Sequence, residues 1–226
     1  MAVNKNDSWQ FVASLWPRKA EAFERKGRGE QMGPERPLCH APGQHMERCF
    51  LVSVAPVLAG AKPGALVSFH QGCAAAWHAH GERLCEITGL SARVLHGSEE
   101  SVSLLLYHRE RLAAQISSSA AEDILAQHGY PPGACLEEAL AYLRKRFVDC
   151  RFPHEIGVFL GYPPEDVAAF IRHGGKGYLC CRYWKVYYNE QRARELFKHI
   201  DAAKAKALRL IARQVPLYTA ARLLRL

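Results

Sequence analysis

The segment from residue 152 to residue 187, FPHEIGVFLGYPPEDVAAFIRHGGKGYLCCRYWKVY, contains the most specific structural signals in this chain. Pro153 suits the first turn of a helix, where its missing N–H group would have no partner, and Gly161 is suited to end that helix. Pro163 and Pro164 predict the start of a second helix, which the following Gly-Gly pair ends. The segment therefore predicts two short helices joined by a tight turn.

The end of this segment extends into residues 178–188, YLCCRYWKVYY, which we predict to form a strand. Aromatic and β-branched residues are typical of strands. Alternation along the strand would place Cys181, Tyr183, Lys185 and Tyr187 on one face. The whole stretch thus predicts a helix–turn–helix–strand unit.

The motifs FPHEIG, FLGYP, EDV, FI and WKVY, in this order and spacing, resemble a bacterial family catalogued as domain of unknown function 3793. Residues 55–69, APVLAGAKPGALVSF, resemble the N-terminal block of that family, APTLAGIKPA. The chain departs from the pattern at Val57 and Arg182, where Thr and Gly are usual. The resemblance spans residues 39–199 and implies a cytoplasmic protein of mostly anaerobic bacteria, with relatives near iron-acquisition genes. It implies no activity and no catalytic residues.

The distribution of charge divides the chain into three parts. The formal net charge of +8 is +2 over residues 1–37, +6 over residues 202–226 and zero between them. We expect an N-terminal extension and linker (1–37), a family-like α+β domain (38–201) and a basic helical tail (202–226). Because nucleic acid attracts positive charge, the neutral domain is not expected to bind it.

The cysteines and the hydropathy pattern bear on location. Eight cysteines occur without a C-x-x-C pair, and most are expected to be small buried side chains. The N-terminus does not resemble a signal peptide, and no apolar run is long enough to span a bilayer. We therefore expect a cytoplasmic protein with reduced thiols and no transmembrane segment.

The rest of the pattern predicts an α+β fold, with a small mixed sheet packed with several helices in a single domain that has a C-terminal helix. Apolar runs rich in β-branched residues predict strands at residues 49–57, 65–70, 90–96 and 101–107. Helical periodicity predicts helices at residues 72–88, 108–115, 119–128 and 134–149. Asn189 is suited to cap a long helix that begins at Glu190.

The loop at residues 58–64, LAGAKPG, is the first candidate for a binding site. Loops at the carboxyl ends of strands form ligand crevices in α/β sheets. Lys62, beside small residues, can offer a positive charge and free N–H groups to an anion. We expect a small-ligand pocket between this loop and the FPHEIG–WKVY unit, with candidate residues Lys62, His154, Glu155, Tyr162 and Lys185. The alternative is an ordinary turn with a solvated lysine.

His154 and Glu155 are also candidates for acid–base chemistry. Both lie at a predicted helix N-terminus, which favours a carboxylate and lowers the pKa of an imidazole. The pair is not a zinc-protease motif, because Val158 stands where the second histidine would be needed. The alternative is helix capping and a hydrogen-bonded histidine.

Two groups of histidine and cysteine are candidates for a metal or haem site, since both side chains are common ligands. The first group contains His70, Cys73, His78 and His80, and the second contains Cys39, His40, His45 and Cys49. Their spacings match no standard zinc motif. The alternative is that these histidines lie on the surface.

Three functions stay open on the sequence alone. The first is a small-ligand binding or accessory protein of anaerobic, iron-linked metabolism. The second is an enzyme that uses His154 and Glu155 for proton transfer. The third is a nucleic-acid or membrane-surface adaptor that acts through the basic tail. The sequence indicates no oligomeric state.

Overall fold

The computed structural model describes residues 42–149 and 152–225. All described residues belong to one compact unit. The extension predicted at residues 1–37 lies outside the described residues. Within the part of the chain that the structure describes, no helix has both the length and the apolar character needed to cross a bilayer.

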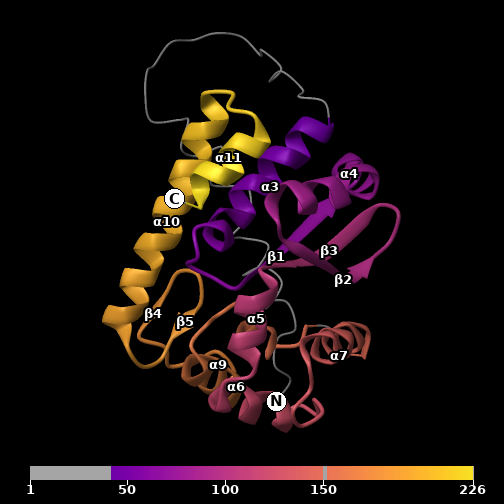
Figure 1. Ribbon diagram of the computed structural model, residues 1–226. Helices are drawn as coiled ribbons and strands as arrows, with labels where there is room; N and C mark the ends of the chain where they lie inside the picture. The colour runs from indigo at the N-terminus through magenta and orange to yellow at the C-terminus, as the bar shows by residue number, and fades with distance from the viewer. Residues whose placement is uncertain (1–41, 150–151, 226) are drawn as a thin grey trace, which may run out of the picture. The chain divides into compact units, whose positions relative to one another are not determined.

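Helices alternate with three strands in the first half of this unit and dominate the second (Figure 1). The first elements are α3 (Pro42–Leu58), β1 (Gly64–His70), α4 (Gly72–Thr88), β2 (Ser91–Gly97) and β3 (Ser101–Tyr107). Next come α5 (Arg109–Ile116), α6 (Ser119–Gln127), α7 (Leu136–Asp149), α8 (Ile156–Phe159) and α9 (Pro164–Arg172). The last are β4 (Cys180–Cys181), β5 (Lys185–Val186), α10 (Glu190–Ala212) and α11 (Leu217–Leu224). The predicted α+β class is confirmed.

The main sheet has the strand order β1-β3-β2 and is antiparallel throughout, rather than mixed. β3 is the central strand. Its Leu105 lies opposite Leu66 of β1 on one side and opposite Arg93 of β2 on the other. The register shifts between Val94 and His96, as at a β-bulge. Helix α4 connects β1 to β2, and a tight turn connects β2 to β3.

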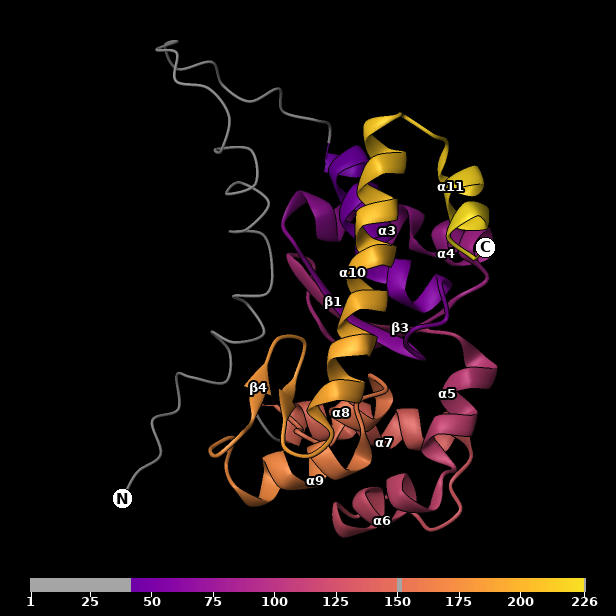
Figure 2. The same cartoon turned by 90° about the vertical axis from the view of Figure 1, so that its left-hand side faces the viewer.

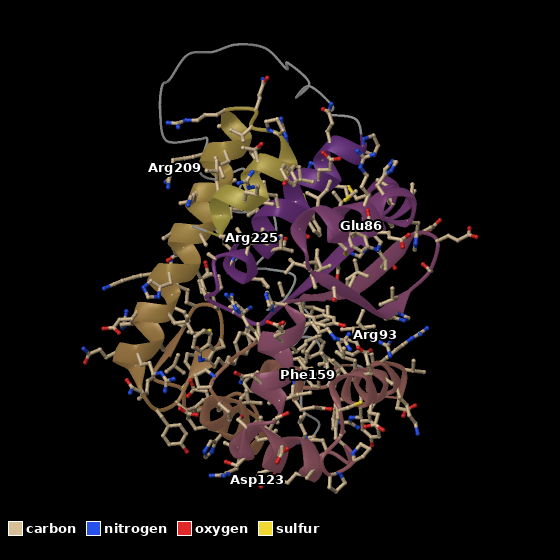
Figure 3. The ribbon with its side chains drawn as sticks, viewed as in Figure 1. Glu86, Arg93, Asp123, Phe159, Arg209 and Arg225 are labelled. Atoms are coloured by element: carbon tan, nitrogen blue, oxygen red, sulfur yellow. The ribbon has the colours of Figure 1, made fainter. Side chains whose placement is uncertain are left out.

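The sheet separates two hydrophobic clusters, because successive side chains of a strand point to opposite faces. Leu104 and Leu106 of β3 pack with α3, α4, α10 and α11, whereas Leu105 and Tyr107 pack with α5 to α9. Figure 1 shows these two groups of helices on either side of the sheet. Phe159 of α8 is fully buried in the second cluster (Figure 3).

The strand predicted at residues 49–57 is wrong, because this run lies in α3. Every residue from Ser53 to Leu58 is buried, since α3 packs against α4, β1, α10 and α11. A helix that is buried on all sides has an apolar run without periodicity, and such a run cannot be distinguished from a buried strand.

The single strand predicted at residues 178–188 is also wrong. The segment forms a hairpin of two short strands, in which Cys180 pairs with Val186. The carboxylate of Asp166 accepts hydrogen bonds from the backbone N–H groups of Tyr187 (2.8 Å) and Tyr188 (3.2 Å). Those amides are therefore unavailable to a strand partner, and the ladder ends.

The basic tail is part of the packed domain. Helix α10 begins after Asn189, whose side chain accepts a hydrogen bond from the Arg192 N–H group, and continues across residue 201 without a break. Figure 2 shows α10 beside α3, with its first turns near β4. Lys206 donates to the Leu223 carbonyl (2.6 Å), and Arg225 donates to the Thr88 carbonyl (Figure 3).

Candidate functional site

The loop at residues 58–64 contacts the corner between α8 and α9. A Cβ atom on Gly161, whose φ is +74°, would lie 2.2 Å from Cδ of Pro63. A Cβ atom on Gly64 would lie 2.7 Å from the carbonyl oxygen of Phe159. The two backbones therefore approach so closely that only glycine fits at these positions. The early lysine-bearing turn and the late proline-led helices are thus neighbours in space.

Lys62 lies at this junction. Its Nζ is 5.1 Å from the centroid of the Tyr162 ring, and the residue is half-buried. It forms no hydrogen bond or ion pair with the residues that the structure describes. Burial, followed by the positive charge of Lys204, lowers its pKa to about 7, because both disfavour a charged amine.

Lys204, the positive neighbour of Lys62, interacts in turn with two residues of the β4–β5 hairpin, Arg182 and Tyr183. Nζ of Lys204 is 4.6 Å from the centroid of the Tyr183 ring, and burial lowers its pKa. The Tyr183 hydroxyl donates to Asp201 (2.7 Å), and Arg182 forms an ion pair with the same carboxylate (2.7 Å). We call these residues the lysine cluster: Lys62, Tyr162, Arg182, Tyr183, Asp201 and Lys204. It contains three basic side chains and one carboxylate.

Asp166 is a residue that the sequence analysis did not single out. It is only 3% exposed, and besides the two backbone amides it accepts a hydrogen bond from Nε1 of Trp184 (2.8 Å). Its only signal in the sequence is its place in the first turn of α9, where the positive end of the helix dipole favours any acidic residue. In the structure it fixes the hairpin that carries Arg182 and Tyr183.

A pocket of about 120 Å³ lies beside the lysine cluster. Its lining includes Tyr162, Trp184, Asp166, Asn189 and Arg192. Drug-sized ligands occupy roughly 300–1,000 Å³, so this pocket suits a group of a few atoms. Among the five pocket candidates from the sequence, Tyr162 alone belongs to its lining.

Glu155 and His154 have different surroundings from Lys62. Glu155 is 1% exposed and forms an ion pair with Nε of Arg146 (2.8 Å). The His154 ring is 6.0 Å from the Phe152 ring and 5.1 Å from the Phe170 ring, and burial lowers its pKa. Neither residue lines the pocket.

Lys185, like His154, lies beside the Phe170 ring. Its Nζ donates to the Gly175 carbonyl (2.8 Å) and lies 5.6 Å from the Phe170 ring centroid. Lys185 and His154 therefore share Phe170, whereas Lys62 contacts Tyr162. The structure brings Lys62 and Tyr162 together and places the other three pocket candidates around different partners.

The metal candidates are not assembled by the structure. His70, His78 and His80 are exposed, and Cys73 Sγ lies 3.8 Å from the Pro42 carbonyl. Within residues 42–149 and 152–225, no group of three or more His, Cys, Asp or Glu side chains is placed to hold a metal ion.

The second group is only partly described. His45 Nε2 and Cys49 Sγ are 3.6 Å apart on α3. Cys39 and His40 lie outside the described residues, so the group as a whole stays a prediction.

The fold is an α+β domain in which the lysine cluster contains residues of the LAGAKPG loop, the β4–β5 hairpin and α10. The chain belongs to the family described as "Protein of unknown function (DUF3793)", whose model matches residues 50–220. This match confirms the family resemblance and includes every residue of the lysine cluster. No curated protein and no solved structure matches the chain.

Proposed function

We propose that this protein binds a small anionic ligand at the lysine cluster. The observation that carries the proposal is the imbalance of charge among half-buried groups. Asp201 is the only carboxylate in the cluster as defined above, and it already interacts with Arg182 and Tyr183. Lys62 and Lys204 repel each other, so an anion near both would relieve this repulsion.

The surroundings favour a small anion over a large one. Partial burial strengthens electrostatic attraction because water screens it less. The aromatic rings of Tyr162 and Tyr183 stabilise the lysine side chains through cation–π contacts. The neighbouring pocket of about 120 Å³ has room for a carboxylate or phosphate group with few further atoms.

The cellular setting of this function is a further part of the proposal. The resemblance to a family of mostly anaerobic bacteria supports an accessory role in anaerobic, iron-linked metabolism. The free thiols of the six described cysteines support a cytoplasmic location. Metal analysis and an absorbance spectrum of anaerobically purified protein test the iron link. Bound iron or haem would support it, and a colourless, metal-free protein would overturn it.

The other two functions have less support. The carboxylate of Glu155 is buried and paired with Arg146, which leaves it poorly suited to accept a proton from a substrate. The basic tail buries Ala203, Ala207 and Leu224 in the main core, so its apolar face is not free for a membrane. We therefore retain anion binding as the proposal.

Isothermal titration calorimetry at low ionic strength tests it, with inorganic phosphate, acetate and pyruvate as probes. At least one probe should bind the wild-type protein saturably. Lys62→Met and Lys204→Met should each weaken binding at least about tenfold, the loss expected for one contact to a charged group. Lys198→Met, at an exposed position of the same helix α10, is the matched control. Absence of saturable binding, or equal binding by all variants, would contradict the proposal.

A further inference from the structure

The amine of Lys62 differs in its contacts from the amines of Lys185, Lys204 and Lys206. Lys185 donates to the Gly175 carbonyl and Lys206 to the Leu223 carbonyl. Lys204 has Asp201 as an electrostatic partner. Lys62 has neither a carbonyl nor a carboxylate partner among the described residues. Its nitrogen therefore contacts the Tyr162 ring but makes no hydrogen bond or ion pair with the described residues.

A lysine amine becomes nucleophilic when a dry environment or a neighbouring cation keeps it unprotonated. Both conditions hold at Lys62, because it is half-buried and lies near Lys204. With a pKa of about 7, about half of the amine is neutral at pH 7. At the usual lysine pKa, fewer than about one amine in a thousand is neutral at that pH.

We propose that Lys62 forms a Schiff base with small carbonyl compounds that carry an anionic group, of which α-oxo acids are the simplest class. Lys204 and Arg182 would hold the anionic group, so the inference rests on the proposed anion-binding function. Tyr162, whose ring lies 5.1 Å from the Lys62 amine, also lines the neighbouring pocket of about 120 Å³, which has room for the few heavy atoms of such a compound. Lys62 thus combines an amine that has no hydrogen-bond or ion-pair partner among the described residues with one positive neighbour, Lys204.

The reaction requires no oxidant or reductant. The Nζ lone pair of Lys62 attacks the carbonyl carbon, a C–N bond forms, and the π electrons of the C=O bond move to oxygen, which takes up a proton. Nζ then loses its proton, the hydroxyl group leaves as water, and a C=N bond forms. One amine and one carbonyl compound thus give one imine and one water.

The groups around Lys62 determine how the reaction depends on pH. Lys204 comes from α10, and Tyr162 comes from the corner between α8 and α9. Of the hairpin residues, Arg182 acts electrostatically on Lys204 and Cys181 acts on Tyr162. Arg111 of α5 packs against the other side of the loop, where a Cβ atom on Gly60 would lie 2.8 Å from its Nη1. Asp201, the one carboxylate, is paired with Arg182. Burial and the positive charge of Lys204 together keep about half of the Lys62 amine unprotonated at pH 7.

Trapping by reduction tests the inference. The protein is incubated with pyruvate and sodium cyanoborohydride, and the adduct is located by peptide mass spectrometry. We expect one saturable adduct on the peptide that contains Lys62, with a yield that is half-maximal near pH 7. Lys204→Met should lower the yield at least about tenfold through loss of the anion contact. Lys198→Met is the control and should leave the yield unchanged.

Lys62→Arg distinguishes this inference from the proposed function. Arginine keeps the positive charge and has no nucleophilic amine at neutral pH, so this variant should still bind phosphate in the calorimeter but form no adduct. Phosphate binding by the wild type without an adduct would overturn the Schiff base and leave anion binding intact. Labelling that is spread over surface lysines and persists in Lys62→Arg would also overturn it. An adduct without phosphate or acetate binding would instead contradict the proposed function.

Discussion

At the scale of single residues, Asp166 holds in place the hairpin that carries Arg182 and Tyr183. One buried carboxylate accepts three hydrogen bonds from the hairpin, two of them from backbone amides. Hydrogen bonds to a charged group are stronger than neutral ones. The position of Arg182 and Tyr183 in the lysine cluster thus depends on a residue that contacts neither lysine.

Replacement of this carboxylate should destabilise the protein. In Asp166→Asn the amide keeps one acceptor oxygen, and its NH₂ group faces a donor. We expect the free energy of unfolding to fall by about 2–3 kcal/mol, measured by urea denaturation. Glu165→Gln, at the exposed neighbouring position of α9, is the control and should change it by less than about 0.5 kcal/mol. Equal effects of the two substitutions would show that Asp166 does not anchor the hairpin.

The lowered pKa of Lys62 has a consequence for stability. Its folded-state pKa of about 7 lies below the usual 10.5, so the unfolded chain binds more protons between these values. The charged amine therefore opposes folding most below pH 7, and this effect disappears as the pH rises towards 10.5.

Lys62→Met should therefore stabilise the fold at low pH. After allowance for solvent screening, we expect a gain of roughly 1 kcal/mol at pH 6 and a smaller gain at pH 9. Chemical denaturation at the two pH values measures both. A gain that is independent of pH would mean that burial of the charge is not its cause.

At the scale of elements, the close approach of the LAGAKPG loop to the α8–α9 corner determines whether the site can form. Gly161→Ala places a methyl group against Pro63 at a position with φ of +74°. It should cost more than about 2 kcal/mol, since strain and a steric clash add, and it should weaken phosphate binding. Gly133→Ala, where φ is +65° and no atom lies within 4 Å, isolates the backbone strain and should cost about 1 kcal/mol. Denaturation and calorimetry on both variants separate the two effects.

The same scale shows what the sequence could predict. The helix predicted at residues 72–88 matches α4, because the residue that ends it, Gly89 with φ of +58°, is a local signal. The apolar run at residues 49–57 resembles a strand in sequence. It forms a helix because elements distant in the sequence bury it on all sides. Within the lysine cluster, the sequence near each residue is enough to predict Lys62 and Tyr162 as site residues. It does not predict Lys204 and Asp201, because their contacts depend on how α10 packs.

At the scale of the described unit, the three-stranded sheet is covered on both faces by helices. Without a βαβ crossover between neighbouring strands, the sheet is antiparallel, and its central strand β3 is buried almost throughout. The basic tail helps to cover one face. The net positive charge at the end of the sequence therefore belongs to a structural element, with exposed side chains such as Arg209 directed outward (Figure 3).

Two leucines of the tail test this role. Leu224 is 2% exposed and Leu208 is 56% exposed. Leu224→Ala should lower the free energy of unfolding by about 2–4 kcal/mol through the lost burial and the cavity left behind, and Leu208→Ala should change it by less than about 0.5 kcal/mol. Thermal and urea denaturation give both values. If Leu224→Ala were as mild as Leu208→Ala, the tail would not belong to the core.

Helix α10 contributes to two hydrophobic clusters along one unbroken length. Phe197 and Ile200 pack with the hairpin, whereas Ala203 and Leu210 pack with α3. If either cluster lost its packing, the part of α10 in that cluster would unfold, and the other cluster would lose support from the same helix. We therefore expect these two clusters to lose their structure together, in a single cooperative transition.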